Sequence, residues 1–345
     1  MKAMVFSRNG GPEVLEEAEL PTPTIGDGEV LLEVKACGLN HLDLWARAGL
    51  PFSIPMPHVG GCEATGVVAE VGKGVTGIGP GARVLIAPGL CCRHCWWCLH
   101  DEDPRCAEYR VAGLHTQGGF AEYTKADAHD CIPISPTWSF AEWSAVPLTF
   151  LTAWHMLFHH ARLEPGDDVL VQAAGSGVGT AAIQVARLVG ARVFATAGSD
   201  AKLRQAQELG AHHVINYREQ NFADEILRLT DRRGVDVVVE HVGADVWRDS
   251  LKSLAKGGRL VTCGATSGPE VSLDLRFFFT RELTVTGSYM GTRSELLEVL
   301  RHVERRELQP VVDRVFPLSE LRAAQEYMHD RRQFGKIVLE PDWSK

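Results

Sequence analysis

The 345-residue sequence has no excess of positive charge. It contains 35 Lys and Arg residues against 44 Asp and Glu residues, which gives a formal net charge of −9. Nucleic-acid-binding surfaces concentrate positive charge, so this balance argues against a nucleic-acid partner. Apolar residues make up 45% of the chain and charged residues 23%. These values are typical of a soluble globular protein and exclude a disordered or collagen-like one.

Long hydrophobic runs are also missing. The most apolar stretch, Val146–Phe158, is too short to span a membrane and contains Pro147 and His155. The first residues carry one Lys and then polar positions, whereas a signal peptide has an apolar centre. We therefore expect a soluble, cytoplasmic protein with no membrane partner.

The nine cysteines do not form the dense, even-numbered framework of a small secreted domain. Four of them follow the pattern Cys92-x2-Cys95-x2-Cys98-x7-Cys106, and Cys91 lies outside this spacing. Four thiolates at such spacing can close a tetrahedral shell around Zn²⁺ and leave no position for water or substrate. The pattern predicts one structural Zn²⁺ in a lobe at residues 91–108, where the metal largely determines the local fold. A disulfide pair or free thiols are the alternatives.

The pattern of the chain changes near residue 150. Before it, short apolar runs such as Glu29–Ala36 are separated by Gly and Pro turns, which is typical of a small β barrel or sandwich. After it, six β-branched runs alternate with helical stretches, which predicts a doubly wound parallel sheet. We expect a first domain at 1–150, completed by 290–345, and a second domain at 151–289. The six predicted strands are Asp168–Ala173, Arg192–Thr196, His213–Asn216, Val235–Glu240, Arg259–Cys263 and Leu283–Ser288.

A glycine-rich loop follows the first predicted strand of the second domain. It reads Ala174-Gly175-Ser176-Gly177-Val178-Gly179 and opens an apolar helix. Glycines at such a turn let the backbone approach a pyrophosphate, which the helix N-terminus stabilises. The position between strand and helix favours a dinucleotide contact at Gly175, Ser176, Gly177 and Val178 over a ligand-free turn.

The end of the second predicted strand lacks the carboxylate that NAD sites use to bind the ribose 2′-hydroxyl. Ala197 and Gly198 stand there instead, and the small Gly198 leaves room for a 2′-phosphate. Ser199 can donate a hydrogen bond to this phosphate, and Lys202 can supply the counter-charge. Asp200 is expected to cap a helix that starts at Ala201. The turn therefore favours NADPH over NADH.

Several motifs together resemble the zinc-containing alcohol dehydrogenase and quinone oxidoreductase superfamily of medium-chain dehydrogenases/reductases. The resemblance covers essentially the full length and implies an α/β protein. It implies a GroES-like β domain, a Rossmann coenzyme domain and an active site in the cleft between them. The motifs are Lys35–Asp43, Gly60–Gly66, the four-Cys lobe, Gly118–Tyr123, Pro147–Trp154 and the coenzyme loop.

The sequence departs from this family at the catalytic metal. The three ligand positions of the family's catalytic zinc fall on Asn40, Cys62 and Leu148, and only Cys62 is a convincing ligand. The family's proton-relay hydroxyl falls on Leu42. Alcohol oxidation relies on a Lewis acid, whereas conjugate reduction needs only hydrogen-bond donors for the developing enolate oxygen. We therefore expect NADPH-dependent reduction of an activated C=C bond or a quinone, a small-molecule substrate, without catalytic zinc.

The resemblance and the residue types also suggest roles for individual residues near the coenzyme and the substrate. His41 is a candidate general acid or coenzyme ribose contact, Asp43 a residue that orients its neighbours, and Trp45 a side chain lining the substrate site. Tyr217 is expected near the 2′-phosphate, and Lys336 near the pyrophosphate. Ordinary packing, capping or surface roles are the alternatives for these residues. The last predicted strand, Leu283–Ser288, is expected to pair across a two-fold axis in a homodimer, or in a tetramer built from it.

Two further functions stay open. One is a zinc-type alcohol dehydrogenase or carbonyl reductase, with zinc in an improvised site of Cys37, His41, Cys62 or Glu63. The other is an NADPH-binding protein with little catalysis. The pairs His159–His160 and His212–His213 are expected at exposed helix ends and show no metal-ligand spacing.

Overall fold

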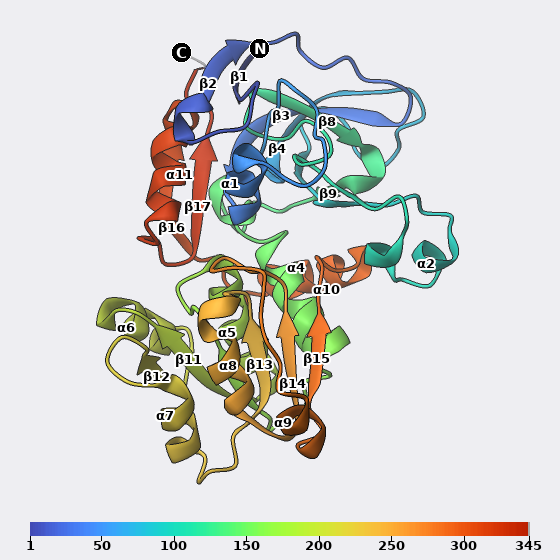
Figure 1. Cartoon of the computed structure of the whole chain (residues 1–345). Coiled ribbons are helices and arrows are strands. Elements are labelled where there is room, and N and C mark those ends of the chain that lie inside the picture. The colour runs from blue at the N-terminus through green and yellow to red at the C-terminus, as the bar shows by residue number, and fades with distance from the viewer. Residues whose placement is uncertain (344–345) are drawn as a thin grey trace. The chain divides into compact units, whose positions relative to one another are not determined.

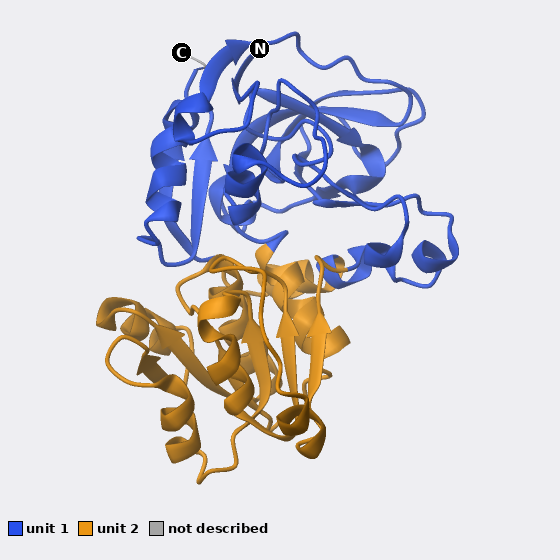
Figure 2. Cartoon of the chain, viewed as in Figure 1, with its two compact units in different colours: residues 1–148, 292–296, 310–345 blue, residues 149–291, 297–309 orange. Residues whose placement is uncertain are grey.

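A computed structural model describes residues 1–343 and divides into two compact units (Figure 1, Figure 2). Unit 1 comprises Met1–Leu148, Thr292–Leu296 and the chain from Pro310 onward, and unit 2 comprises Thr149–Gly291 and Leu297–Gln309. Within residues 1–343 no helix is both long and apolar enough to cross a membrane.

One segment departs from the predicted domain boundaries. Residues 297–309 were expected to rejoin the first domain, yet they pack with unit 2. The segment buries the apolar side chains of Val299, Val303 and Leu308. It is also held by two hydrogen bonds, because Gln184 Nε2 donates to Gln309 O at 3.0 Å and Gln309 N donates to Gln184 Oε1 at 2.8 Å.

Unit 1 is built on a seven-stranded sheet. Its order is β16-β17-β3-β4-β5-β9, and β8 also pairs with β3. The C-terminal strands thus complete the N-terminal sheet, and all pairs except β16–β17 are antiparallel. The strands of unit 1 are β1 (Lys2–Val5), β2 (Glu16–Glu19), β3 (Glu29–Gly38), β4 (Glu63–Val71), β5 (Arg83–Ile86), β6 (Gly89–Leu90), β7 (Arg110–Val111), β8 (Tyr123–Asp127), β9 (Cys131–Pro133), β16 (Val312–Pro317) and β17 (Lys336–Glu340).

Short helices connect these strands. Helix α1 begins soon after β3, which places its first turn beside the start of β4 in the same sheet. The helices of unit 1 are α1 (His41–Ala48), α2 (Trp96–Leu99), α3 (Phe140–Trp143) and α11 (Leu321–His329), with 3₁₀ turns η1 (Pro12–Val14), η2 (Asp103–Arg105), η3 (Ala128–Asp130) and η5 (Leu318–Glu320).

Unit 2 is a six-stranded parallel sheet with helices on both faces (Figure 1). The order β12-β11-β10-β13-β14-β15 reverses between β10 and β13, which confirms the predicted doubly wound topology. The strands read as nearly continuous apolar runs because both faces are covered. The strands are β10 (Asp168–Val171), β11 (Arg192–Ala197), β12 (His213–Asn216), β13 (Val235–Glu240), β14 (Leu254–Thr262) and β15 (Thr284–Gly287).

Two groups of helices pack on this sheet. Helix α4 packs on α5, and α7 packs on α8 over a core that includes Phe194, Ile226 and Leu260. Helices α8 and α9 were not among the helical stretches named from the sequence, and α9 is only six residues long. The helices are α4 (Thr149–Trp154), the π-helical turn η4 (His155–His160), α5 (Gly177–Val189), α6 (Asp200–Glu208), α7 (Phe222–Leu229), α8 (Ala244–Lys252), α9 (Leu275–Thr280) and α10 (Arg293–Glu304), whose first residues belong to unit 1.

Candidate functional site

The glycine loop lies at the carboxyl end of β10 and opens helix α5. Ser176 caps the helix, with its Oγ accepting a hydrogen bond from Gly179 N at 2.8 Å. A Cβ on Gly179 would lie 2.4 Å from Ala173 O, so only glycine allows this close approach of helix and strand. Gly175, Ser176, Gly177 and Val178 are thus gathered at a helix N-terminus, which is a ready site for a pyrophosphate.

The loop is also tied to β13 by a contact that the sequence did not indicate. Ser176 Oγ and His241 Nε2 are 2.8 Å apart, and His241 directly follows β13. This hydrogen bond joins the strand ends on either side of the point where the strand order reverses. Dinucleotides bind across such a point in doubly wound sheets.

The end of β11 brings the predicted 2′-phosphate residues together. A Cβ on Gly198 would lie 2.6 Å from Tyr217 Oη and 3.0 Å from Arg218 Nε, so both side chains lie over this glycine. Ser199 is the N-cap of α6, and Lys202 lies in its first turn. Two groups that can hydrogen-bond a phosphate, Tyr217 and Arg218, therefore lie over a backbone position without a side chain, and two more, Ser199 and Lys202, follow it in sequence.

The prediction for Asp200 was wrong by one residue. Helix α6 begins at Asp200 with Ser199 as its N-cap, so Asp200 does not cap a helix starting at Ala201. Its carboxylate instead accepts a hydrogen bond from Asn216 Nδ2 at 3.2 Å. Asp200 is thus the first residue of α6, and this hydrogen bond ties it to the end of β12.

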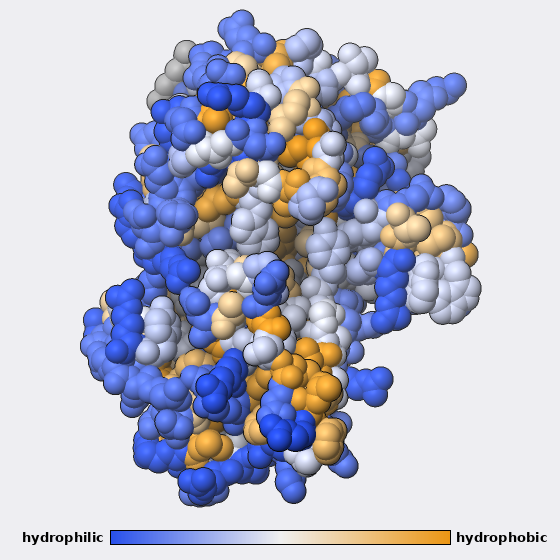
Figure 3. Space-filling model, viewed as in Figure 1, coloured by the Kyte–Doolittle hydropathy of each residue, from blue (hydrophilic) through white to orange (hydrophobic). Residues whose placement is uncertain are grey.

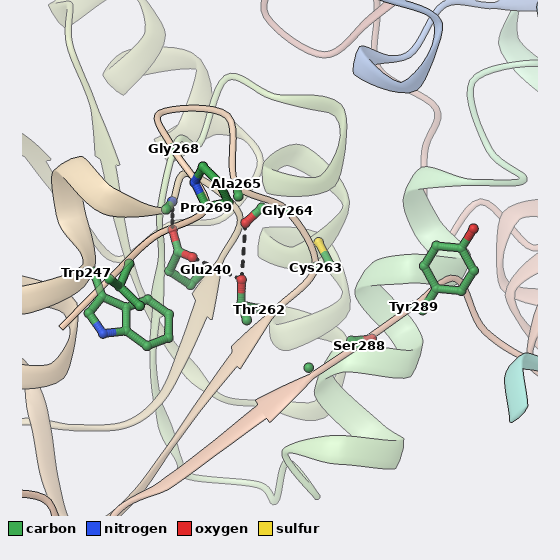
Figure 4. Close-up of a pocket in the computed structure, with 13 residues that line it drawn as sticks. Glu240, Trp247, Thr262, Cys263, Gly264, Ala265, Gly268, Pro269, Ser288 and Tyr289 are labelled. Carbon is green, nitrogen blue, oxygen red and sulfur yellow. Dashed lines mark hydrogen bonds between the residues drawn. The ribbon is translucent and has the colours of Figure 1, made fainter. Parts of the chain in front are cut away.

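A pocket of about 510 Å³ opens at the carboxyl ends of β13, β14 and β15 (Figure 4). Glu240 at its base is fully buried, and its carboxylate accepts hydrogen bonds from Val242 N (2.6 Å), Gly243 N (2.8 Å) and Thr262 Oγ1 (3.1 Å). Burial raises the pKa of Glu240, and these donors oppose the shift. Glu240 therefore orders the loop after β13.

The opposite side of the pocket carries an unsatisfied hydroxyl. Ser288 is 8% exposed, and its Oγ has no hydrogen-bond partner within the described part of the chain. In Figure 4 it lies across the pocket from Trp247. A buried polar group without a partner favours a ligand that can hydrogen-bond it.

The four cysteines of the predicted zinc lobe converge. Their Sγ atoms all lie within 4.8 Å of one another, with Cys92 and Cys98 at 3.8 Å and Cys95 and Cys98 at 3.5 Å. A tetrahedral Zn–S₄ site with bonds of about 2.3 Å requires sulfur–sulfur distances of about 3.8 Å, so the set fits zinc. Backbone N–H groups of His94 and Cys95 lower the pKa of Cys92 to about 6, which favours the thiolate that binds metal.

The lobe has almost no hydrophobic core of its own. No residue of α2 is buried, and Trp96 and Leu99 are 60% and 70% exposed. All four cysteines are free thiols in the structure, so no disulfide holds the lobe. These observations support the expectation that bound metal stabilises it.

Three buried polar side chains, those of Lys336, Asn40 and Glu63, form a hydrogen-bonded ring that includes one of the family's catalytic-metal positions, Asn40. Lys336 Nζ donates to Asn40 Oδ1 at 2.7 Å, to Leu39 O at 2.8 Å and to Glu63 Oε2. Asn40 Nδ2 donates to Glu63 Oε2 at 2.8 Å. Lys336 is 3% exposed and Glu63 fully buried, so the ammonium and the carboxylate neutralise each other in the core.

Asp43 fixes the turn that carries Asn40. Its carboxylate accepts hydrogen bonds from Asn40 N at 2.8 Å and Gly61 N at 3.0 Å. Burial raises the pKa of Asp43 to about 6, against the opposing effect of these two N–H groups. Asp43 thus completes the capping box of α1, as the capping alternative expected, but it does so as a buried residue and not at the surface.

His41 and Trp45 lie on the same side of helix α1. Their ring centroids are 6.2 Å apart, and Trp45 is 38% exposed. His41 directly follows Asn40, a member of the Lys336–Asn40–Glu63 hydrogen-bonded ring. Burial, together with the positive charges of Lys336 and Arg331, lowers the pKa of His41 to about 4. His41 is thus a neutral imidazole at pH 7, so it can donate one N–H hydrogen bond but holds no imidazolium proton.

The residues at the family's catalytic-metal positions do not fit a zinc site. Asn40 is committed to Lys336 and Glu63, and the backbone N–H of Leu148 donates to Glu63 Oε1 at 2.7 Å. Burial raises the pKa of the Cys62 thiol well above its usual range, and its Sγ lies 3.4 Å from Asn40 Nδ2. An amide, a leucine and a neutral thiol are not the ligand set of a catalytic zinc.

The improvised zinc site has no better geometry. Within residues 1–343, no group of three potential ligand atoms in mutual reach includes Cys37, His41, Cys62 or Glu63. The Cys37 sulfur instead packs against Gly61 and Gly119, where added Cβ atoms would approach it to 2.7 and 2.9 Å. Cys37 is therefore a core residue.

Comparison with known proteins agrees with this architecture. Residues 26–136 match the alcohol dehydrogenase GroES-like domain, and residues 177–305 match the zinc-binding dehydrogenase family. A GroES-like unit and a doubly wound unit with a dinucleotide loop define a two-domain oxidoreductase that uses a nicotinamide coenzyme. The chain belongs to the zinc-containing alcohol dehydrogenase and quinone oxidoreductase superfamily of medium-chain dehydrogenases/reductases.

Three similar proteins span different activities. A crystal structure of an NAD-dependent alcohol dehydrogenase is 47% identical, with a TM-score of 0.96 over 99% of this chain and 100% of that one. The 2-haloacrylate reductase of Burkholderia sp is 34% identical over 98% of each chain. The quinone oxidoreductase of Rattus norvegicus is 29% identical over 98% of this chain and 97% of its own.

Proposed function

We propose that the protein is an NADPH-dependent reductase of an activated C=C bond or a quinone and that it works without catalytic zinc. The observation that carries this proposal is the Lys336–Asn40–Glu63 ring, in which Asn40, at one of the family's three catalytic-metal positions, is already hydrogen-bonded to an ammonium and a carboxylate. The similarity to a 2-haloacrylate reductase and to a quinone oxidoreductase supports the same reaction class.

Asn40 is the donor we assign to the developing enolate or quinol oxygen. One of its N–H groups is held by Glu63 at 2.8 Å, while the other has only long contacts, to the Cys62 sulfur at 3.4 Å and to Gly38 O at 3.5 Å. That second N–H is therefore available to a stronger acceptor. Hydride from the coenzyme goes to carbon, and a positioned donor stabilises the negative charge that develops on oxygen. The neutral imidazole of His41 can supply a second donor.

Lys336 takes a different role from the predicted pyrophosphate contact. Its ammonium has three N–H donors, and all three are used by Leu39, Asn40 and Glu63. We propose that Lys336 positions the Asn40 amide, with its Oδ1 toward the ammonium and its Nδ2 toward Glu63 and Cys62.

A panel of quinones, short enals and alcohols, assayed with both coenzymes, tests the proposed function. We expect NADPH oxidation with enals or quinones and little alcohol oxidation. Turnover confined to alcohols and aldehydes would refute the proposal. A protein that binds NADPH and turns over no member of the panel would also refute it.

The coenzyme is proposed to lie along the carboxyl edge of the unit 2 sheet. Its pyrophosphate would bind at the N-terminus of α5, and its adenosine half over β11 and β12, beside Gly198 and Ser199. The two halves of a dinucleotide bind on either side of the switch point. The nicotinamide half would therefore enter the pocket at β13–β15, where the unsatisfied Ser288 hydroxyl can hydrogen-bond a carboxamide.

Lys202→Ala should weaken NADPH binding by about tenfold to a hundredfold and leave NADH binding nearly unchanged. The change removes a charge-assisted contact to the 2′-phosphate, which contributes about 1.5–3 kcal/mol. Fluorescence titration with both coenzymes measures the effect, and Lys256→Ala, an exposed lysine elsewhere in unit 2, is the matched control.

Gly198→Asp should reverse the coenzyme preference. The new carboxylate can bind ribose hydroxyls, repels a 2′-phosphate and lies beside Arg218. Gly198→Ala introduces the same Cβ near Tyr217 without charge and separates crowding from electrostatics. If the wild-type protein binds NADH as tightly as NADPH, and Lys202→Ala changes neither, the phosphate-pocket assignment is wrong.

A zinc-type alcohol dehydrogenase is the second candidate function. It is favoured by the 47% identity to an NAD-dependent alcohol dehydrogenase. In this case zinc would have to bind at a set of residues in which only Cys62 is a suitable ligand, and NADH would be the coenzyme.

One structural zinc per chain is expected at Cys92, Cys95, Cys98 and Cys106. Cys95→Ser should release this zinc and loosen the exposed lobe, because three ligands and almost no hydrophobic core remain. NADPH binding should be retained, since the coenzyme residues lie in unit 2. Elemental analysis and limited proteolysis measure both effects. A Cys95→Ser protein that keeps its full zinc content would contradict the assignment.

The protein is expected to form a homodimer, or a tetramer built from it, through β15. This strand is an edge of the unit 2 sheet, and an open edge is a surface that proteins usually cover. Large apolar side chains are exposed nearby, and Figure 3 shows apolar surface over the β14, β15 and α9 region. These side chains are Val271, Leu273, Leu275, Phe279 and Tyr289.

Val285→Pro would remove an N–H donor that faces the open edge and should weaken the dimer, because Ser288 N donates to Thr262 O and alternate residues of β15 therefore face β14. Light scattering at micromolar concentration measures the oligomeric state. A wild-type monomer at that concentration would contradict the dimer.

A further inference from the structure

Three histidines converge on the π-helical turn η4 of unit 2, far along the sequence from both sites described above. His155, His159 and His160 each offer a ring nitrogen, and these nitrogens lie within 4.8 Å of one another. The rings of His155 and His159 stack at 4.4 Å, and the His160 ring meets both nearly edge-on at 4.7 Å. The pair His159–His160 was predicted at an exposed helix end without metal-ligand spacing, and in an ordinary α-helix these two neighbours would point about 100° apart.

The π-helical geometry explains this convergence. In an α-helix the fifth residue after His155 would point about 140° away from it, so His160 would leave the cluster. In a π-helix the hydrogen bonds run from i to i+5, and residues i+4 and i+5 both return to the side of residue i. The structure has such a bond, with Ala161 N donating to Met156 O at 2.9 Å. The wide turn thus presents His159 and His160 to His155.

We propose that His155, His159 and His160 form a binding site for one borderline divalent transition-metal ion, such as Ni²⁺, Zn²⁺ or Cu²⁺. Imidazole nitrogen suits these ions, whereas Mg²⁺ and Ca²⁺ prefer oxygen ligands, and the cluster contains no carboxylate. Three protein ligands leave at least one coordination position for water. The site is independent of the proposed enzymatic function.

Only small movements are needed to bind the ion. Tetrahedral coordination with Zn–N bonds of about 2.0–2.1 Å requires nitrogens about 3.4 Å apart. In the structure the three ring nitrogens lie within 4.8 Å of one another, so they need to move only slightly closer. His155 is 3% exposed and anchors one ligand in the core, while His159 and His160 are half-buried and can rotate toward it. A bound ion would link both ends of the π turn, which packs on β14 and α5.

The site is tested by titrating Ni²⁺ into untagged protein that has been loaded with zinc and then treated with a mild chelator, so that zinc stays in the cysteine lobe and the histidine cluster is empty. Isothermal titration calorimetry should show one further ion per chain. His159→Gln and His160→Gln should each weaken this binding by about tenfold or more, since even indirect partners of metal ligands change affinity by about 10–100-fold. The double variant should abolish it. His213→Gln, a histidine of unit 2 that stacks on Phe194, is the matched control and should bind Ni²⁺ as the wild type does.

Two further measurements keep the test independent of folding defects. Saturating Ni²⁺ should raise the melting temperature of the wild type and of His213→Gln but not that of the double variant. With Cu²⁺, the electron paramagnetic resonance spectrum should show coupling to several imidazole nitrogens, which the double variant lacks. Absence of a further Ni²⁺ ion in the wild type would overturn the proposal. Equal Ni²⁺ affinity in the wild type and a folded double variant would also overturn it.

Discussion

Replacing Lys336 with Met is expected to lower the free energy of unfolding by about 3–5 kcal/mol, the usual effect of removing one partner of a buried ion pair. Met has a similar length and would fill the same space. It would leave the Glu63 carboxylate fully buried with hydrogen bonds from Asn40 and Leu148 but without a counter-charge. Chemical denaturation, followed by a probe in unit 1, measures the change.

Two further variants separate charge from packing. The double variant Glu63→Gln/Lys336→Met removes both charges and should recover much of the lost stability, because no uncompensated ion remains in the core. Lys125→Met breaks the exposed pair with Glu29, whose atoms are 2.8 Å apart, and should change stability by only about 0–1 kcal/mol. If Lys336→Met unfolds as the wild type does, the buried ion pair is not the stabilising element described here.

Asn40→Ala is expected to reduce kcat for enal or quinone reduction by on the order of a hundredfold or more, as in sites that lose one donor to a developing oxyanion. KM should change much less, because the donor acts mainly on charge that appears in the transition state. Steady-state kinetics with NADPH measures this split, and unchanged coenzyme affinity shows that unit 2 is intact. A rate within a few-fold of the wild type would exclude Asn40 as the donor.

Cys62→Ala distinguishes the two candidate functions. The Cys62 sulfur contacts Asn40 Nδ2 at 3.4 Å without fixing it, so a zinc-independent reductase should keep most of its activity in this variant. A zinc-dependent dehydrogenase would lose its only suitable ligand at the catalytic-metal positions and with it the reaction. The outcome therefore bears on the reaction class as well as on this residue.

The sheet of unit 2 could be predicted closely because its strands are compact β-branched runs between helical segments. His213–Asn216 and Val235–Glu240 begin and end as predicted. Strand β14 was predicted from Arg259, yet it begins at Leu254, because Lys256, Gly257 and Gly258 do not read as a strand. Helix α6 begins one residue earlier than expected, and this shift moved the N-cap from Asp200 to Ser199.

The ring in unit 1 could not be predicted from local sequence. Lys336 and Glu63 are 273 residues apart, and no periodicity relates a C-terminal strand to the start of β4. The family's ligand positions led to the expectation that no zinc binds at Asn40, but they did not indicate that the Lys336 ammonium contacts Asn40 and Glu63. The four cysteines could be predicted as a set because their ligands lie within fifteen residues of one another.

The zinc content of catalytically active protein tests the central claim most directly. Protein purified without added metal and treated with a mild chelator should contain close to one zinc per chain, bound by the cysteine lobe. It should retain full NADPH-dependent reduction of enals or quinones. Two zinc ions per chain in protein that also carries His159→Gln and His160→Gln would contradict the account, as would activity that disappears with a second zinc and returns when that zinc is restored.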